Sequence, residues 1–94
     1  MDNLEIKHTK IALKILKGYD KPTRSHIRHK INGLTETPPV GDIVRLEGSE
    51  NEFRLRVGKY RVIYEYLTQN DIKILMINKI DSRGGIYKGS VKKE

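Results

Sequence analysis

Apolar residues recur at helical spacing through the first part of the chain. They form two groups, each of which marks one face of an expected helix: Ile11, Ala12, Ile15, Leu16 and Tyr19 in the first, and Ile27, Ile31 and Leu34 in the second. Thr9 suits the N-cap of the first helix, and Pro22 suits the first turn of the second. Pro38 and Pro39 are expected to end the second helix, because proline cannot continue it.

From residue 43 onwards the apolar positions alternate, as they do in β-strands. The alternation predicts strands over 43–46, 53–57, 60–67 and 72–80, preceded at the start of the chain by a short extended segment over 4–6. Residues 68–71, with the sequence TQND, are expected to form a four-residue loop. This order predicts an α+β class, with two N-terminal helices packed on a four- to five-stranded, mainly antiparallel sheet. The length predicts one domain over residues 1–94.

The segment RLRVGKYRVIYEY, residues 54–66, has the pattern of a β-hairpin. Gly58 and Lys59 are expected to form a two-residue turn of type II′, with glycine at the first central position. That turn defines a register in which three apolar pairs face the core, namely Val57 with Tyr60, Leu55 with Val62, and Phe53 with Tyr64.

The same register leaves arginines on the opposite face of the hairpin. Arg56 faces Arg61 directly, and Arg54 faces Ile63. Like charges that face each other across two strands destabilise a sheet by up to about 1 kcal/mol. We therefore interpret the three arginines as a phosphate clamp, since guanidinium is permanently charged and can bind two phosphate oxygens at once. The alternative is a solvated polar face that Glu65 or Asp81 neutralises.

The overall charge also favours an anionic partner. Lysine and arginine outnumber aspartate and glutamate by 19 to 12, which gives a net charge of +7. A small domain with this charge is suited to nucleic acid, or to an acidic protein that masks it, because neutralising phosphates releases counterions. Asp42 and Glu47 are interpreted as charges of a turn and of a strand edge.

Several kinds of site and location are disfavoured by what the chain contains. The absence of cysteine excludes disulfides and thiolate metal sites, and it favours a reducing cytosol. No segment has the apolar length of a signal peptide or a membrane span, so a cytoplasmic protein without a membrane partner is expected. His26 and His29 lie three residues apart without an evident third ligand, so no metal site is expected. We expect no cofactor.

The hairpin and the segment after it resemble a known family. The order of elements, the stretch GDIVRLEGSENEFRLRVGKYRVIYE at 41–65 and the ending SRGGIYK at 82–88 are together similar to the RelE/ParE superfamily of bacterial type II toxins. The resemblance implies a microbial-ribonuclease-like fold. RelE-type members cut mRNA in the ribosomal A site, and an antitoxin neutralises them by laying a segment over the toxin.

The resemblance also implies roles for particular residues. Arg61 matches a family arginine that stabilises the reacting phosphate, and Arg83 and Tyr87 match the arginine and tyrosine near the family's C-terminus. These three are the candidate catalytic residues. The candidates for binding RNA phosphates are Arg54, Arg56, Lys59 and Lys79.

Two departures from the family pattern bear on the chemistry. Asp81 and Ser82 stand where the family often carries histidine or a second arginine. Arginine at 54 and 56, where the family often has lysine, removes a plausible general base because guanidinium stays protonated. Tyr87 is the best candidate for proton transfer, and Lys59, Lys79 and Glu65 stay open for the opposite acid or base role.

The partners implied are a cognate antitoxin and the ribosome with its mRNA, including contacts to 16S rRNA. Operator DNA is expected to be bound only through the antitoxin complex. Two other functions stay open: a ParE-like inhibitor of DNA gyrase that cleaves nothing, and an inactive member that only binds antitoxin or operator.

Overall fold

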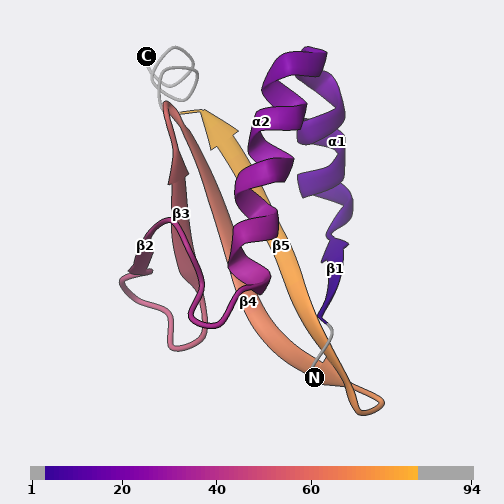
Figure 1. Cartoon of the computed structure of the whole chain (residues 1–94), viewed down its shortest axis with the longest axis vertical. Coiled ribbons are helices and arrows are strands. Elements are labelled where there is room, and N and C mark those ends of the chain that lie inside the picture. The colour runs from indigo at the N-terminus through magenta and orange to yellow at the C-terminus, as the bar shows by residue number, and fades with distance from the viewer. Residues whose placement is uncertain (1–3, 83–94) are drawn as a thin grey trace.

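The computed structural model describes residues 4–82 of the chain (Figure 1). Within them the elements follow one another as β1 (Glu5–His8), α1 (Lys10–Gly18), α2 (Lys21–Asn32), the short 3₁₀ helix η1 (Gly33–Thr35), β2 (Asp42–Arg45), β3 (Phe53–Val57), β4 (Tyr60–Gln69) and β5 (Ile72–Ser82). The predicted α+β class, with both helices ahead of the main strands, is confirmed.

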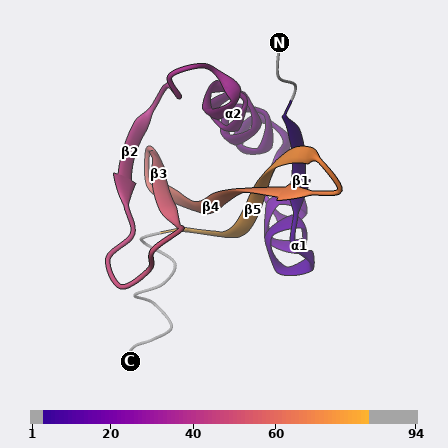
Figure 2. The ribbon, with the colours of Figure 1, turned by 90° about the horizontal axis from the view of Figure 1, so that it is seen from below.

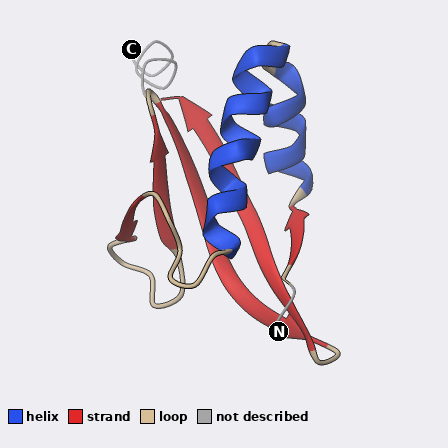
Figure 3. Ribbon diagram, viewed as in Figure 1, coloured by secondary structure: helices blue, strands red, loops and turns tan. Residues whose placement is uncertain are grey.

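The five strands form one sheet in the order β1-β5-β4-β3-β2. β1 runs parallel to β5, and the other three pairings are antiparallel. Figure 2 shows that the twisted sheet curls around α2, and α1 contacts β5 and β1. Figure 3 shows the two helices side by side, next to the long hairpin of β4 and β5. The helices therefore cover one face of the sheet and leave the other free for polar side chains.

Thr9 links the start of α1 to β5. Its side-chain oxygen accepts a hydrogen bond from the amide of Ala12 at 3.1 Å, which confirms it as the N-cap. Its hydroxyl also donates to the carbonyl of Asn78 at 2.9 Å, and its amide donates to the carbonyl of Ile77 at 3.0 Å. One residue thus caps the helix and ties it to β5.

The second helix ends earlier than the prolines suggested. Asp20 is the N-cap residue of α2, and Pro22 lies in its first turn as expected. The helix ends at Asn32, and η1 follows before Pro38 is reached. The backbone is tied down there because the Val40 amide donates to the Gly33 carbonyl at 3.0 Å. The prolines therefore lie in the connection to β2 and do not terminate the helix themselves.

The core lies between the helices and the inner face of the sheet. Its fully buried members come from both helices, from η1 and from alternate positions of β3, β4 and β5, and they include Ala12, Leu16, Ile27, Ile31, Leu34, Leu55, Val57, Val62, Tyr64, Leu75, Ile77 and Ile80. This set confirms the strand alternation and the stripe of the second helix, and it confirms the first stripe only at Ala12 and Leu16, with Tyr19 partly buried against it. Ile11 and Ile15, expected on the inner face of the first helix, are instead 66% and 37% exposed.

The turn between β4 and β5 is tighter than the sequence suggested. β4 extends past its predicted end at residue 67 to Gln69, whereas β5 begins at Ile72 as predicted, so the expected four-residue loop is wrong. Asn70 and Asp71 make a two-residue turn with φ values of 51° and 66°. Asparagine and aspartate tolerate this left-handed conformation, which a type I′ hairpin turn requires at both positions.

Burial of His8 makes the stability of the fold depend on pH. Partial burial, and then the charge of Arg28, lower the pKa of His8 below its ordinary value of 6.5. The unfolded chain therefore takes up this proton at a higher pH than the folded chain does. We expect the free energy of unfolding to fall as the pH drops below about 6.5, and to stop falling from this cause below the folded-state pKa.

Urea unfolding at pH 7.5 and pH 5.5 would check this expectation. His8→Gln should reduce the difference between the two conditions, and His29→Gln, at an exposed position of α2, serves as the matched control. An undiminished pH difference in His8→Gln would contradict the assignment.

Candidate functional site

Four charged residues form a row across the outer face of the sheet, away from the helices. Asp42 on β2 pairs with Arg56 on β3, which pairs in turn with Arg61 on β4. Arg61 pairs with Asp81 on β5. Side chains alternate along each strand, so these four point away from their buried neighbours Leu55, Val57, Val62 and Ile80. Two arginines thus lie together at the centre of the row, with one aspartate at each end.

The predicted hairpin, which places Arg56 opposite Arg61 in this row, is confirmed in its register and in its turn. The observed register pairs Val57 with Tyr60, Arg56 with Arg61 and Arg54 with Ile63. Gly58 has a φ of 61°, whereas Lys59 does not have a positive φ, as a type II′ turn requires. The turn residues therefore determine which side chains meet on the outer face.

Asp81 binds Arg61 through both of its carboxylate oxygens. Arg61 Nε lies 3.1 Å from Oδ1 and Nη2 lies 3.4 Å from Oδ2. The Asp81 side chain is 18% exposed and that of Arg61 is 37% exposed, so the pair is only partly in water. Lys79 approaches the same carboxylate, with Nζ 3.9 Å from Oδ2. This carboxylate is thus shared by two cations.

Asp42 performs a similar role at the other end of the row. Its Oδ1 lies 3.4 Å from Arg54 Nη2, and its Oδ2 lies 3.9 Å from Arg56 Nε. The prediction of Asp42 as an edge charge is confirmed, since it begins the edge strand β2, and the pairing with β3 also brings it against two arginines. Arg54 is the most buried of these arginines, with an 18% exposed side chain, and its Nε is buried without a hydrogen-bond partner.

These contacts show that acidic side chains partly neutralise the arginines that were predicted to form a phosphate clamp. The sequence has no acid between residues 53 and 64, yet Asp42 and Asp81 reach the arginines from neighbouring strands. The alternative in which Asp81 neutralises the face is observed. Four cations and two carboxylates make up the patch, so its charge stays positive. We call this set the arginine patch: Arg54, Arg56, Arg61, Lys79, Asp42 and Asp81.

Residues 6–87 match the family described as the ParE toxin of the type II toxin–antitoxin system parDE. The chain belongs to the RelE/ParE superfamily of toxins. A candidate toxin named RelE1, from Methanocaldococcus jannaschii, is 38% identical over 90 residues, which cover 92% of this chain and 94% of that protein.

Solved structures of RelE proteins share the fold. The archaeal RelE–RelB complex from Pyrococcus horikoshii OT3 matches with a TM-score of 0.67 and 28% identity, covering 86% of this chain and 96% of that one. The RelB–RelE antitoxin–toxin complex from Methanococcus jannaschii matches with a TM-score of 0.64 and 25% identity, covering 85% and 93%. The fold expected from the family resemblance is thus confirmed.

The RelE/ParE resemblance assigns catalysis to Arg61, Arg83 and Tyr87, and only the first lies among the described residues. Arg61 is at the centre of the arginine patch. Arg83 and Tyr87 lie outside residues 4–82. Ser82, the last described residue, pairs with Tyr60, which precedes Arg61 on β4. The assignments to Arg83 and Tyr87 stay predictions.

The candidates for the remaining acid or base role lie at different places. Lys79 is part of the patch, with a 62% exposed side chain. Lys59 is at the hairpin turn, with its Nζ 5.6 Å from the centre of the Tyr60 ring. Glu65 accepts a hydrogen bond from Asn78 Nδ2 at 2.9 Å, and Glu52 accepts one from the same nitrogen at 2.8 Å. Glu65 is thus held by Asn78 and not by an arginine of the patch.

Residues 4–82 hold no cluster of three or more histidine, aspartate or glutamate side chains that could bind a metal ion. Across the same range, neither helix is long and apolar enough to cross a membrane.

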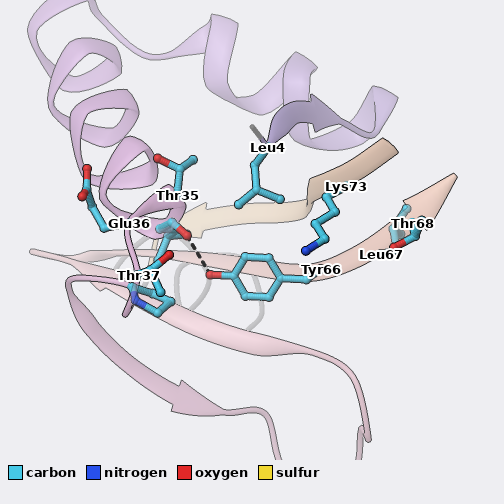
Figure 4. A pocket seen from close by; sticks show the side chains of 10 residues that line it. Leu4, Thr35, Glu36, Thr37, Tyr66, Leu67, Thr68 and Lys73 are labelled. Carbon is cyan, nitrogen blue, oxygen red and sulfur yellow. Dashed lines mark hydrogen bonds between the residues drawn. The ribbon is translucent and has the colours of Figure 1, made fainter. Parts of the chain in front are cut away.

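A separate pocket of about 400 Å³ lies towards the opposite end of β4 and β5. Figure 4 shows Tyr66 reaching across it, and its hydroxyl donates to the carbonyl of Leu34 at 2.8 Å. Burial raises the pKa of Tyr66, so the phenol stays a donor at neutral pH. Leu4 and Lys73 line the same space. This pocket shares no residue with the arginine patch.

Removing the Tyr66 hydroxyl should weaken the attachment of η1 to the sheet. Tyr66→Phe leaves the Leu34 carbonyl without this donor, so we expect a loss of about 1 kcal/mol in the free energy of unfolding. Urea unfolding would measure the loss. Unchanged stability would mean that the hydrogen bond contributes nothing beyond what water supplies.

Proposed function

We propose that this chain is a RelE-type toxin that cleaves mRNA on the ribosome and thereby stops translation. The observation that carries the proposal is the adjacent pair of outward-facing arginines, Arg56 and Arg61, on the face of the sheet that the helices leave open. Like charges across strands repel, and Asp42 and Asp81 offset this repulsion only in part because the patch keeps a net positive charge. A phosphodiester between them would remove the repulsion.

The chemistry follows from what RNA cleavage by its own 2′-hydroxyl needs. The 2′-oxygen attacks phosphorus and loses its proton to a base, and the bond to the 5′-oxygen breaks as that oxygen gains a proton. Negative charge builds up on the phosphorane, so fixed cations beside it lower the barrier, usually as the largest single contribution. Arg54, Arg56, Arg61 and Arg83 would supply this stabilisation, with Lys59 and Lys79 binding neighbouring phosphates.

Proton transfer needs a group that can change its protonation state. Arginine stays protonated and cannot serve as the base. Tyr87 is proposed for one transfer, and Lys59, Lys79 or Glu65 for the other. A site that relies mainly on charge and position would need the ribosome to hold the mRNA in line, because orientation then supplies much of the rate.

The related RelE structures are complexes with RelB antitoxins, and we propose a cognate antitoxin for this chain as well. An acidic segment would suit its net charge of +7. Operator DNA would be bound only through that complex. The other proposed partners are the ribosome, its mRNA and 16S rRNA, in the cytoplasm.

A second candidate function is inhibition of DNA gyrase without cleavage. The family that matches residues 6–87 is described as the ParE toxin, and this observation favours it. The carboxylates of Asp42 and Asp81 beside the arginines would also suit a member that does not bind RNA phosphate, including an inactive one.

A bacterial translation extract separates the candidates. The purified protein is added to the extract, mRNA ends are mapped by primer extension, and supercoiling by gyrase is measured in parallel. Cuts that keep the codon phase and that vanish in Arg61→Ala would support the RNase. Gyrase inhibition with intact mRNA would refute it, and the absence of both mRNA cleavage and gyrase inhibition would indicate the inactive member.

A further inference from the structure

The carboxylate of Asp81 occupies the Nε–Nη2 edge of Arg61, one of the two edges through which a guanidinium can bind two phosphate oxygens. Both of its oxygens contact Arg61, at 3.1 Å to Nε and 3.4 Å to Nη2. Two oxygens held by two guanidinium nitrogens is also the geometry in which arginine binds a phosphodiester. The two anions cannot take the same pair of nitrogens at once.

We propose that Asp81 is an internal competitor of phosphate, so that RNA binds the Nε–Nη2 edge of Arg61 only after Arg61 releases Asp81. The inference rests on the proposed function, because it concerns the affinity of the same arginine patch. Lys79 makes the exchange feasible. Its Nζ lies 3.9 Å from Asp81 Oδ2, so the displaced carboxylate keeps a cationic partner and is not left unpaired.

Asp42 offers a matched comparison within the same row. It is also an aspartate beside arginines of the patch, and it carries the same charge. Its side chain is 57% exposed, and it makes single contacts of 3.4 and 3.9 Å to two different arginines. Asp81 is 18% exposed and holds one arginine through both oxygens. Water screens an exposed pair much more than a partly buried one. Asp81 should therefore limit phosphate binding, and Asp42 should have little effect.

Asparagine substitutions test the difference without a change in side-chain size. An amide can still contact Arg61, but it competes weakly with phosphate because it is neutral. The probe is a short, fluorescein-labelled, single-stranded RNA bound by the full chain, with inorganic phosphate as competitor. We expect Asp81→Asn to bind the RNA roughly tenfold more tightly than the unsubstituted chain. Asp42→Asn should bind the RNA no more than about threefold more tightly than the unsubstituted chain.

Several results would overturn the proposal. Equal gains in the two variants would show only the general effect of removing a negative charge. An unchanged or weaker affinity in Asp81→Asn would show that Asp81 positions Arg61 for binding and does not compete with RNA. Thermal melts accompany each measurement, because an unfolded variant would bind RNA non-specifically.

A second measurement covers the case in which Asp81→Asn does not fold. In the NMR spectrum of the unsubstituted protein, the Nε–H resonance of Arg61 should shift when the protein is saturated with RNA. The shift is expected because the acceptor of this N–H changes from a carboxylate to a phosphate. Arg45, which lies outside the patch and donates to the carbonyl of Glu50, supplies a reference resonance. An Arg61 resonance that keeps its position in the RNA complex would refute the exchange.

This test is independent of cleavage. If the extract experiment shows gyrase inhibition and intact mRNA, the proposed function fails. The ratio of the two affinity gains still decides whether Asp81 competes for anions at Arg61, because only binding is measured.

Discussion

Replacing Arg61 with alanine is expected to lower the rate of mRNA cleavage by about 100-fold or more, because one preorganised group that stabilises transition-state charge is worth about 10²–10³ in rate. Arg61 is central in the row, with Arg56 opposite it on one side and Asp81 on the other. The rate is measured as the appearance of cleaved ends under single-turnover conditions on programmed ribosomes.

Two companion variants make the result specific. Arg61→Lys keeps the charge but loses the planar fork that grips two oxygens, so its rate should fall between those of the unsubstituted chain and Arg61→Ala. Arg45→Ala removes an arginine of β2 that faces Phe53, with its guanidinium carbon 5.4 Å from the ring centre, and it should leave the rate unchanged. Cleavage by Arg61→Ala at the unsubstituted rate would remove Arg61 from the mechanism.

Leu55→Ala is expected to have the largest effect on stability, lowering the free energy of unfolding by about 2–5 kcal/mol. Leu55 is fully buried on β3 between Ile43 and Val62, its neighbours on β2 and β4. Its Cδ1 lies only 2.6 Å from the position a Cβ would take at Gly41, which has a φ of 145°. The side chain is therefore enclosed by backbone as well as by side chains, and the cavity left by alanine cannot easily collapse.

Guanidinium unfolding at neutral pH measures this loss, with Val44→Ala as the control. Val44 lies on β2 next to Ile43 but is 46% exposed, so its truncation should change stability by no more than about 0.5 kcal/mol. The free energy of unfolding of a small domain is about 5–15 kcal/mol in total. Leu55→Ala should therefore unfold at a much lower guanidinium concentration than the control. Similar losses in both variants would contradict the packing described for Leu55.

Much of the fold could be predicted because its signals are local. The N-cap at Thr9, the turn at Gly58-Lys59 and the alternation along β3 and β4 each depend on residues a few positions apart. The errors occurred where local rules compete. Asn70 and Asp71 can form a tight turn or part of a longer loop, and only the full pairing of β4 with β5 selects the tight turn.

The candidate site could likewise be predicted from the sequence only in part. Arg56 facing Arg61 follows from a two-residue turn, and the sequence by itself determined it because that turn defines the register. Asp42 comes from β2, which the connection over 46–52 joins to β3, and Asp81 lies near the far end of β5, beyond a shift of the β4–β5 register between Ile63 and Tyr64. Asp42 reaches Arg54 and Arg56 across the connection between β2 and β3, and Asp81 reaches Arg61 from β5. Local propensity does not define the register of such pairings. Only the tertiary structure could therefore decide that the arginines are already ion-paired.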